Sequence, residues 1–185
     1  ASIYLYDGSP TYPKKNILIE FCAREKITLF GVSAKYIDFL KKEKLNFKKQ
    51  KLPNLKTIAS TGSPLVKESF EFVYKKIKKD VHLTSISGGT DVVGCLVLGN
   101  LFSKVYAGEI QGESLGLDVD IFNEKGKSIH GSKKGELVIK KPFPTMPIKF
   151  WNDKNDKKFK KAYFSKYKNI WHHGDFIQRT KNNGF

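Results

Sequence analysis

The chain has 185 residues, of which 39% are hydrophobic and 13% aromatic, so it can bury a core and is not a disordered segment. No run approaches the roughly 18 apolar residues that a membrane-spanning helix needs. The two cysteines, Cys22 and Cys95, lie far apart within apolar stretches. This cysteine usage indicates reduced thiols and a cytoplasmic protein.

Lysine accounts for most of the positive charge. The chain has 34 basic and 18 acidic residues and a formal net charge of +16, but Arg24 and Arg179 are its only arginines. Arginine is the preferred side chain for reading bases and for gripping phosphate with two hydrogen bonds, whereas lysine mainly solvates a surface. We therefore expect a solvated basic surface and no specific nucleic-acid partner. A polyanion-binding face is the alternative interpretation.

Residues 1–100 alternate between short β-like runs and amphipathic helices. The patterns predict strands at 2–6, 28–31, 57–60, 81–86 and 92–98, and helices at 16–26, 33–44 and 65–79, the second capped by Ser33. Such alternation predicts an α/β subdomain with a mixed, mostly parallel sheet covered by helices.

Helical periodicity disappears near residues 99–104. Strands are predicted at 117–122 and 135–140, with two further antiparallel arms at 170–172 and 176–179. Residues 101–185 are thus expected to form a small antiparallel, β-rich, barrel-like lobe, with an irregular lysine-rich stretch at 152–161.

Residues 85–91, SISGGTD, form the densest group of candidate ligand-binding residues. They follow an apolar strand, at the carboxyl end of which open α/β sheets bind ligands. Gly88 and Gly89 let backbone N–H groups approach an anion, while Thr90 and Asp91 supply a hydroxyl and a carboxylate for phosphate and Mg²⁺. A tight turn capped by Asp91 explains the spacing equally well.

Residues 60–64, STGSP, also lie between a predicted strand and a predicted helix. Small residues there would let a flat ligand approach the main chain. On the sequence alone, an N-cap at Ser63 followed by Pro64 at the first helical position is the favoured interpretation.

Two adjacent histidines precede Gly174 and Asp175 in the segment WHHGD. A zinc site needs three or four ligands, and neither His82 nor His130 has a spacing that completes one. The carboxylate of Asp175 could bind a sugar hydroxyl, although surface turns often have the same sequence.

Taken together and in order, these segments resemble the adenylate-forming acyl-CoA synthetases, most closely their acetoacetyl-CoA synthetase branch. The resemblance runs from Ala1 to Phe185 through the strings ASIYLYDGSPTYP, STGSPL, DVHLTSISGGTD, YAGEIQ, GELVIKKPFPTMP, FWND and WHHGDF. Members join ATP and a carboxylic acid into an acyl-adenylate and pyrophosphate, and CoA then displaces AMP. The resemblance therefore implies ATP, Mg²⁺, CoA and acetoacetate as cofactors and substrates.

The resemblance also implies a role for individual positions. The nucleotide would be bound by Gly62, Ser63 and Pro64 beside the adenine, by Gly89 and Thr90 near the α-phosphate, and by Asp175 at the ribose hydroxyls. Thr90 and Asp91 would be the catalytic residues, with Asp91 holding Mg²⁺. Most of the superfamily has glutamate at this last position, so the aspartate has a shorter reach.

Thr61, Ser87 and Gly88 match the substrate pocket of the family. Relatives that take acetate carry a tryptophan at the position of Gly88, so the glycine would leave room for a four-carbon keto acid. The hydroxyl of Thr61 could donate a hydrogen bond to the 3-keto oxygen.

The family's phosphate loop and its mobile C-terminal domain have no counterpart in these residues, which the resemblance places inside the N-terminal domain of a longer parent chain. We expect the 185 residues alone to lack synthetase activity, because positioning and cationic groups supply most of the rate. A stand-alone nucleotide- or acyl-binding module without catalysis is the alternative function.

Overall fold

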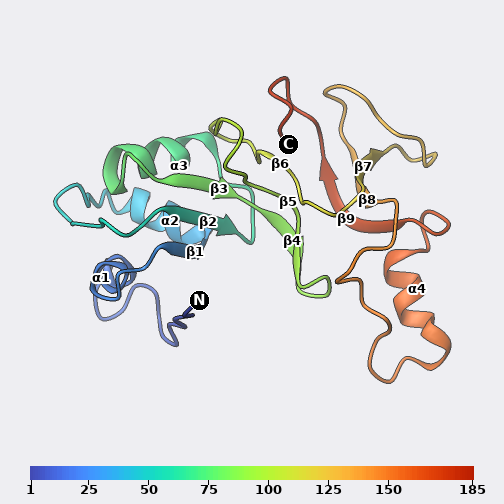
Figure 1. Cartoon of the computed structure of the whole chain (residues 1–185), viewed down its shortest axis with the longest axis horizontal. Coiled ribbons are helices and arrows are strands. Elements are labelled where there is room, and N and C mark those ends of the chain that lie inside the picture. Colours follow the sequence, from blue (N-terminus) through green and yellow to red (C-terminus); the bar gives the residue numbers. More distant parts are fainter. The chain divides into compact units, whose positions relative to one another are not determined.

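In the computed structural model, which describes residues 1–185, the chain divides into unit 1 (Ala1–Thr84) and unit 2 (Ser85–Phe185). Figure 1 shows the elements of both units. The division lies earlier than residue 100, where the sequence changes character. The reason is that β4 (Ser87–Gly89) and β5 (Gly94–Leu98) pair with β6 (Gly112–Glu113) in a sheet of their own.

Unit 1 contains a parallel sheet in the order β1-β2-β3, made of Leu29–Ser33, Thr57–Thr61 and His82–Ser85. Parallel neighbours need crossover connections. Helix α2 (Ala34–Lys42) connects β1 to β2, and α3 (Lys67–Phe72) with its π-helical extension η1 (Val73–Ile77) connects β2 to β3. The predicted α/β architecture of covering helices and a mostly parallel sheet is confirmed.

Local signals in the sequence explain the helices of unit 1. Ser33 caps α2 as predicted, accepting a hydrogen bond from the Tyr36 N–H at 3.2 Å. Helix α1 (Ile17–Arg24) buries Ile19 and Cys22 on one face. The largest side chains that are fully buried in this unit are Ile19, Ile37, Leu40, Leu55, Ile58, Phe70 and Leu83.

Two predictions for unit 1 are wrong. Residues 2–6 do not form a strand: no neighbouring strand pairs with them, and Tyr4 and Tyr6 instead pack edge-on against Phe21 of α1, at 6.1 and 5.8 Å between ring centroids. Ser63 is not an N-cap, because α3 begins at Lys67 after Val66. Residues 62–66 therefore form an exposed loop around the buried Leu65.

Unit 2 contains two antiparallel sheets. One is β4-β5-β6, and the other is β7 (Val119–Phe122), β8 (Gly135–Ile139) and β9 (Trp171–Ile177) in that order. The sheets do not close into a barrel, so the barrel-like form expected for this lobe is corrected to two three-stranded sheets. A single hydrophobic cluster includes Leu96, Val97, Ile121, Leu137, Ile139 and Trp171, residues from both sheets.

Two predictions for unit 2 are also wrong. The two arms predicted at 170–172 and 176–179 are one strand, β9. The lysine-rich stretch at 152–161, which was expected to be irregular, contains helical structure. A short 3₁₀ turn η2 (Lys154–Asp156) leads into helix α4 (Lys157–Tyr163). The helix forms because Phe159 and Tyr163, four residues apart, both pack against the cluster around Trp171.

No helix of either unit combines the length and the apolarity required to cross a membrane.

Candidate functional site

The segment 87–91 forms one strand and the turn of a hairpin. Strand β4 runs antiparallel to β5, with a register shift between Ser87 and Gly88. At the tip of the hairpin, the Val93 N–H donates to the carbonyl of Thr90 at 3.2 Å. The side chains of Thr90 and Asp91 are exposed there, so both are accessible to a ligand.

Gly88 has no room for a side chain in this hairpin. A Cβ at this position would lie 2.1 Å from the carbonyl oxygen of Gly94 and 2.6 Å from Cα of Cys95, both on the backbone of β5. Hairpin packing is thus sufficient to explain the glycine. Gly88→Trp would disrupt the hairpin and is not a clean test of a substrate pocket at this position.

A bulge in β9 presents Asp175. Glu136 of β8 pairs with Phe176 and Val138 pairs with His172, so the single residue between them on β8 faces three residues of β9, His173 to Asp175. Gly174 has a φ of 94°, in the left-handed region that glycine tolerates. The bulge places the Asp175 side chain at the surface, where 56% of it is exposed.

The hairpin and the bulge lie together in unit 2. The hydroxyl of Ser87 donates to Asp175 Oδ2 at 3.0 Å, and His173 Nε2 lies 3.3 Å from the carbonyl oxygen of Gly88. A Cβ on Gly89 would lie 3.1 Å from the His173 ring, so the small residue allows this close approach. Segments 88 residues apart in the sequence therefore form one surface that carries an accessible carboxylate at Asp175.

Tyr163 connects α4 to this surface. Its hydroxyl donates a hydrogen bond to Asp91 Oδ2, and its ring stacks on Trp171 with 3.6 Å between centroids. Burial, and then the hydrogen bond to Asp91, raise the pKa of Tyr163 to about 12, so the phenol remains a donor at neutral pH. Asp91 thus has one oxygen engaged and is held at the tip of the hairpin.

The donor set at Asp91 fits Mg²⁺ bound together with phosphate. Magnesium is usually held by one or two carboxylates, with water and substrate phosphate completing its octahedron. Asp91 supplies one exposed carboxylate, and the structure has no cluster of three or more His, Cys, Asp or Glu side chains that would form an all-protein metal cage.

The adjacent histidines make structural contacts. His172 Nδ1 lies 2.9 Å from the carbonyl oxygen of Tyr163, while His173 faces Gly88 and Asp175. The two side chains therefore support neighbouring segments of the surface.

The third predicted segment belongs to unit 1 and is described by itself. It begins at Ser60, which is buried in β2, and Thr61, the last residue of the strand, to Pro64 are all exposed. Gly62 has a φ of 84°, and a Cβ at this position would meet no atom within 4 Å, so the glycine is needed for its backbone conformation and not for space. The loop offers main-chain groups at the carboxyl end of a parallel strand, where α/β sheets bind ligands.

Two cavities lie away from these residues. One, of about 570 Å³ in unit 1, is bordered by residues that lead into the amino ends of β2 and β3, among them Lys48, Lys51, Lys78 and Lys79. The other, of about 430 Å³ in unit 2, has a lining that includes Phe159, Phe164 and Trp171 as well as lysines. Neither cavity is lined by a predicted site residue.

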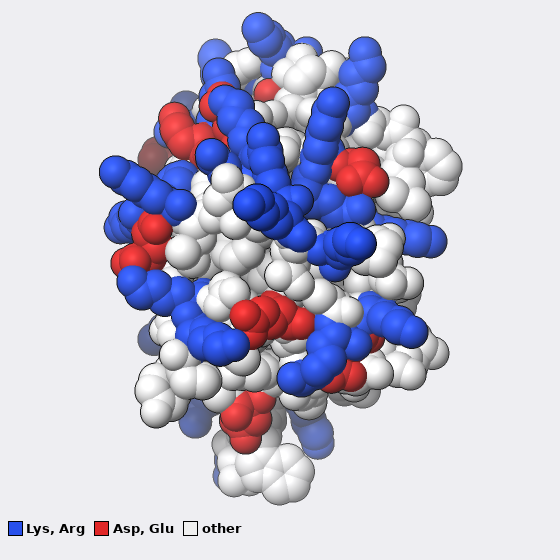
Figure 2. All heavy atoms as spheres, turned by 90° about the vertical axis from the view of Figure 1, so that its left-hand side faces the viewer, with Lys and Arg blue, Asp and Glu red and all other residues white.

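The basic side chains are spread over the surface. Figure 2 shows basic side chains over most of one face, densest in its upper half, with acidic side chains among them. Ion pairs such as Lys41–Asp38 at 3.1 Å and Lys75–Glu71 at 3.4 Å mix the two signs. This distribution is typical of a solvated basic surface.

The supporting roles of three residues were not predicted from the sequence: those of His173, of Tyr163, and of Glu136, whose carboxylate accepts a hydrogen bond from the Gly174 N–H at 2.7 Å. Their contacts with the site depend on a bulge and on helix packing, which local patterns do not encode. Only Glu136 offered a signal, as the one charged residue within the apolar run GELVI.

Known proteins resemble the whole chain. A family model described as AMP-binding enzyme matches residues 1–147. Acetoacetyl-coenzyme A synthetase of Rhizobium meliloti (strain 1021) is 50% identical over 100% of this chain and 28% of its own length. Acetoacetyl-CoA synthetase of Gallus gallus is 46% identical, with the same shares covered.

The fold is found in solved structures as well. Acetoacetyl-CoA synthetase from Streptomyces lividans has a TM-score of 0.89 and 34% identity over 97% of this chain and 28% of its own chain. An anthranilate CoA ligase at 15% identity shares the fold, with a TM-score of 0.80 over 100% of this chain and 33% of its own. This chain thus spans 28% of the length of the curated relatives named above.

Proposed function

This chain belongs to the family of AMP-binding enzymes, and from that premise we propose that it forms the nucleotide-binding part of an AMP-forming acid–thiol ligase acting on acetoacetate. The observation that carries the proposal is the hydrogen bond between Ser87 and Asp175, which joins the hairpin and the bulge in one surface. The similarity to acetoacetyl-CoA synthetases along the entire chain supports the choice of acid.

In the proposed reaction, a carboxylate oxygen of acetoacetate attacks the α-phosphorus of ATP. The new oxygen–phosphorus bond forms as the bond to the bridging oxygen of the β-phosphate breaks, and pyrophosphate leaves. The thiolate of CoA then attacks the acyl carbon, and AMP leaves with the electron pair of the acyl–oxygen bond.

The residues of this chain bind and orient the nucleotide. We propose that Asp175 accepts hydrogen bonds from the ribose hydroxyls, that the Thr90 hydroxyl and the Gly89 N–H lie beside the α-phosphate, and that the Gly62–Pro64 loop flanks the adenine. Asp91 would hold Mg²⁺, which when bound supplies positive charge to the phosphate oxygens. Positioning of this kind accounts for much of the rate of such reactions.

The acyl pocket is proposed to include Thr61, Ser87 and Gly88. Thr61 is exposed at the end of β2, where its hydroxyl is free to meet a keto oxygen. Ser87 is already bonded to Asp175, which supports a place between the ribose and the acyl group. Gly88 would contribute backbone and no side chain.

The remaining partners are part of the same proposal. CoA and the rest of a longer parent chain would complete the enzyme. A cytoplasmic location stays a prediction, with which the free thiols of both cysteines agree.

The experiment that tests this function is ATP–pyrophosphate exchange by the whole protein that contains this chain, with acetoacetate, acetate and short branched acids compared. We expect exchange that depends on acetoacetate and is at least about tenfold slower with acetate, because a site that hydrogen-bonds a keto group discriminates against its absence. The 185-residue chain alone should show no exchange. ATP binding by the whole protein without exchange for any acid would contradict the ligase and favour the binding module.

A further inference from the structure

Glu136 is a buried carboxylate in the middle of an apolar strand. Only 3% of the residue is exposed, and its neighbours Leu137, Val138 and Ile139 are all buried. A buried charge is costly unless hydrogen bonds and an opposite charge compensate it. Both oxygens of Glu136 have such a partner, and each partner comes from a segment near Asp175 in the structure.

The first partner is the backbone of the bulge. The N–H of Gly174 donates to Glu136 Oε1 at 2.7 Å. In a regular antiparallel pair this N–H would be directed into the ladder or to water, but the bulge between the Glu136–Phe176 and Val138–His172 pairs takes Gly174 out of register. The carboxylate of Glu136 therefore fixes the His173–Gly174 peptide, one residue before Asp175.

The second partner is Lys166, whose ammonium group donates to Glu136 Oε2. This lysine also lies 5.5 Å from the ring centroid of Phe176 and 5.6 Å from that of Tyr167. The hydrogen bond to Glu136 raises the pKa of Lys166, so this ammonium group remains charged at neutral pH. Lys166 balances the charge of Glu136 and leaves its other oxygen to Gly174.

We propose that Glu136 is a positioning residue that holds the bulge of β9 in the conformation in which Asp175 can bind the ribose of a nucleotide. The inference rests on the proposed role of Asp175, and it extends that role to a buried residue that need not touch the ligand. The ligand class is a nucleotide with free ribose hydroxyls.

A test of this role compares ATP with 2′,3′-dideoxy-ATP, which lacks both ribose hydroxyls. Dissociation constants of both compounds are measured by calorimetry on the whole protein, so that the result does not depend on catalysis. Wild-type protein should bind ATP about 10- to 100-fold more tightly, as expected for hydrogen bonds to a charged carboxylate. Asp175→Ala should remove this preference.

Glu136→Ala should reduce the preference for ATP by about fivefold or more, because the Gly174 N–H loses its acceptor and the bulge can relax. Glu136→Gln retains one acceptor oxygen for the Gly174 N–H but directs an NH₂ group toward Lys166, so it should keep more of the preference than Glu136→Ala. Asp118→Ala is the matched control. It removes another carboxylate of unit 2, which forms an ion pair with Lys140 at 3.3 Å and not with the bulge of β9. The control should leave the preference unchanged.

Equal weakening of both nucleotides by Glu136→Ala, with the ratio unchanged, would show a merely structural role and overturn the inference. A preference that survives Asp175→Ala would instead contradict the proposed function at the ribose.

Hydrogen exchange of the backbone supplies a second readout that needs no nucleotide. The peptide containing Gly174 should exchange faster in Glu136→Ala than in wild type, and exchange in Glu136→Gln should be slower than in Glu136→Ala because one acceptor oxygen remains. Unchanged exchange in Glu136→Ala would also overturn the inference.

Discussion

Val93 adopts a backbone conformation that a β-branched residue rarely tolerates. Its φ is 48°, and the residue is 81% exposed, so little apolar burial compensates for the strain. The residue lies just beyond Asp91 in the turn of the β4–β5 hairpin. Strained residues of this kind cluster at binding sites, which agrees with the position of the turn in the candidate site.

Val93→Gly should increase the free energy of unfolding by about 0.5–1 kcal/mol, because relief of the left-handed strain exceeds the entropy that glycine adds to the unfolded chain. Urea denaturation followed by circular dichroism measures the change. Leu101→Gly serves as the control, because Leu101 is also an exposed apolar residue but its φ is not positive. Destabilisation by both substitutions would contradict the strain at Val93.

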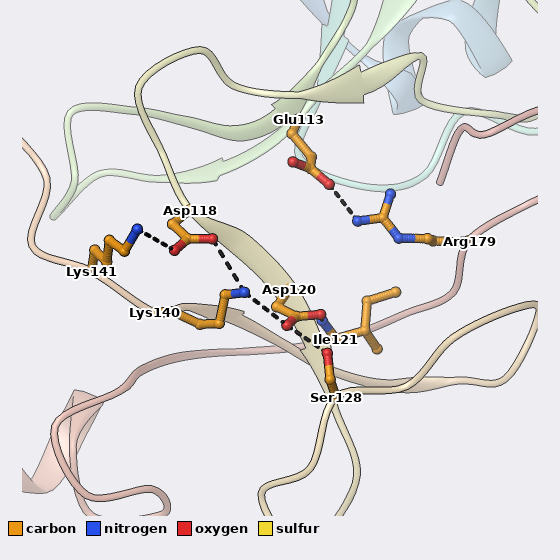
Figure 3. A network of polar contacts seen from close by, with 8 residues as sticks. All are labelled: Glu113, Asp118, Asp120, Ile121, Ser128, Lys140, Lys141 and Arg179. Atoms are coloured by element: carbon orange, nitrogen blue, oxygen red, sulfur yellow. Dashed lines mark hydrogen bonds and ion pairs between the residues drawn. The ribbon is translucent and has the colours of Figure 1, made fainter.

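At the scale of elements, an ion network links β7 to the end of β8. Figure 3 shows Lys140 between Asp118 and Asp120, at 3.3 and 3.2 Å, with Lys141 on the far side of Asp118. Ser128 donates to Asp120 Oδ2 at 2.6 Å, and the Ile121 N–H donates to Asp120 Oδ1 at 2.7 Å. Both carboxylate oxygens of Asp120 thus have hydrogen-bond or ion-pair partners, although the other residues of strand β7 are apolar.

This network predicts how the stability of unit 2 depends on pH. Burial raises the pKa of Asp120, but the hydrogen bonds from Ser128 and Ile121 and the contact with Lys140 outweigh burial and lower the pKa overall. A lowered carboxyl pKa contributes stability above the unfolded value near 4, and this contribution is lost as pH falls through the folded value.

Asp120→Asn should therefore lower the free energy of unfolding at pH 7, by about 1 kcal/mol or less because the pair is partly exposed. The difference from wild type should shrink as the pH falls below the unfolded value and through the lowered folded value, because Asp120 then becomes protonated in both states. Urea unfolding at pH 7 and at pH 3 measures both values. A difference that is equal at the two pH values would contradict the role of the charge.

The sequence predicted elements well where their causes are local. The Ser33 cap, the amphipathic α1 and the strand–helix alternation of unit 1 depend on neighbours within a few residues. Residues 2–6 have the composition of a strand but no pairing partner, and strand pairing is a non-local property. For the same reason, the continuity of β9 through its bulge could not be deduced from residues 170–179 alone.

At the scale of the whole molecule, the candidate site was predicted as three short segments. The structure brings residues 87–91 and Asp175 together within unit 2 through the Ser87 and His173 contacts, whereas the roles of all three segments toward a nucleotide stay predictions. The support from Glu136, Tyr163 and His173 could not be predicted, because it depends on side chains far apart in the sequence meeting across a bulge.

The most direct measurement is a crystal structure of the whole protein with a non-hydrolysable analogue of acetoacetyl-AMP. We predict that the Asp175 carboxylate lies within hydrogen-bond distance of the ribose hydroxyls, that Thr90 contacts the phosphate, and that the loop at 62–64 flanks the adenine. A nucleotide bound elsewhere, with the β4–β5 turn and Asp175 both facing solvent, would contradict the account.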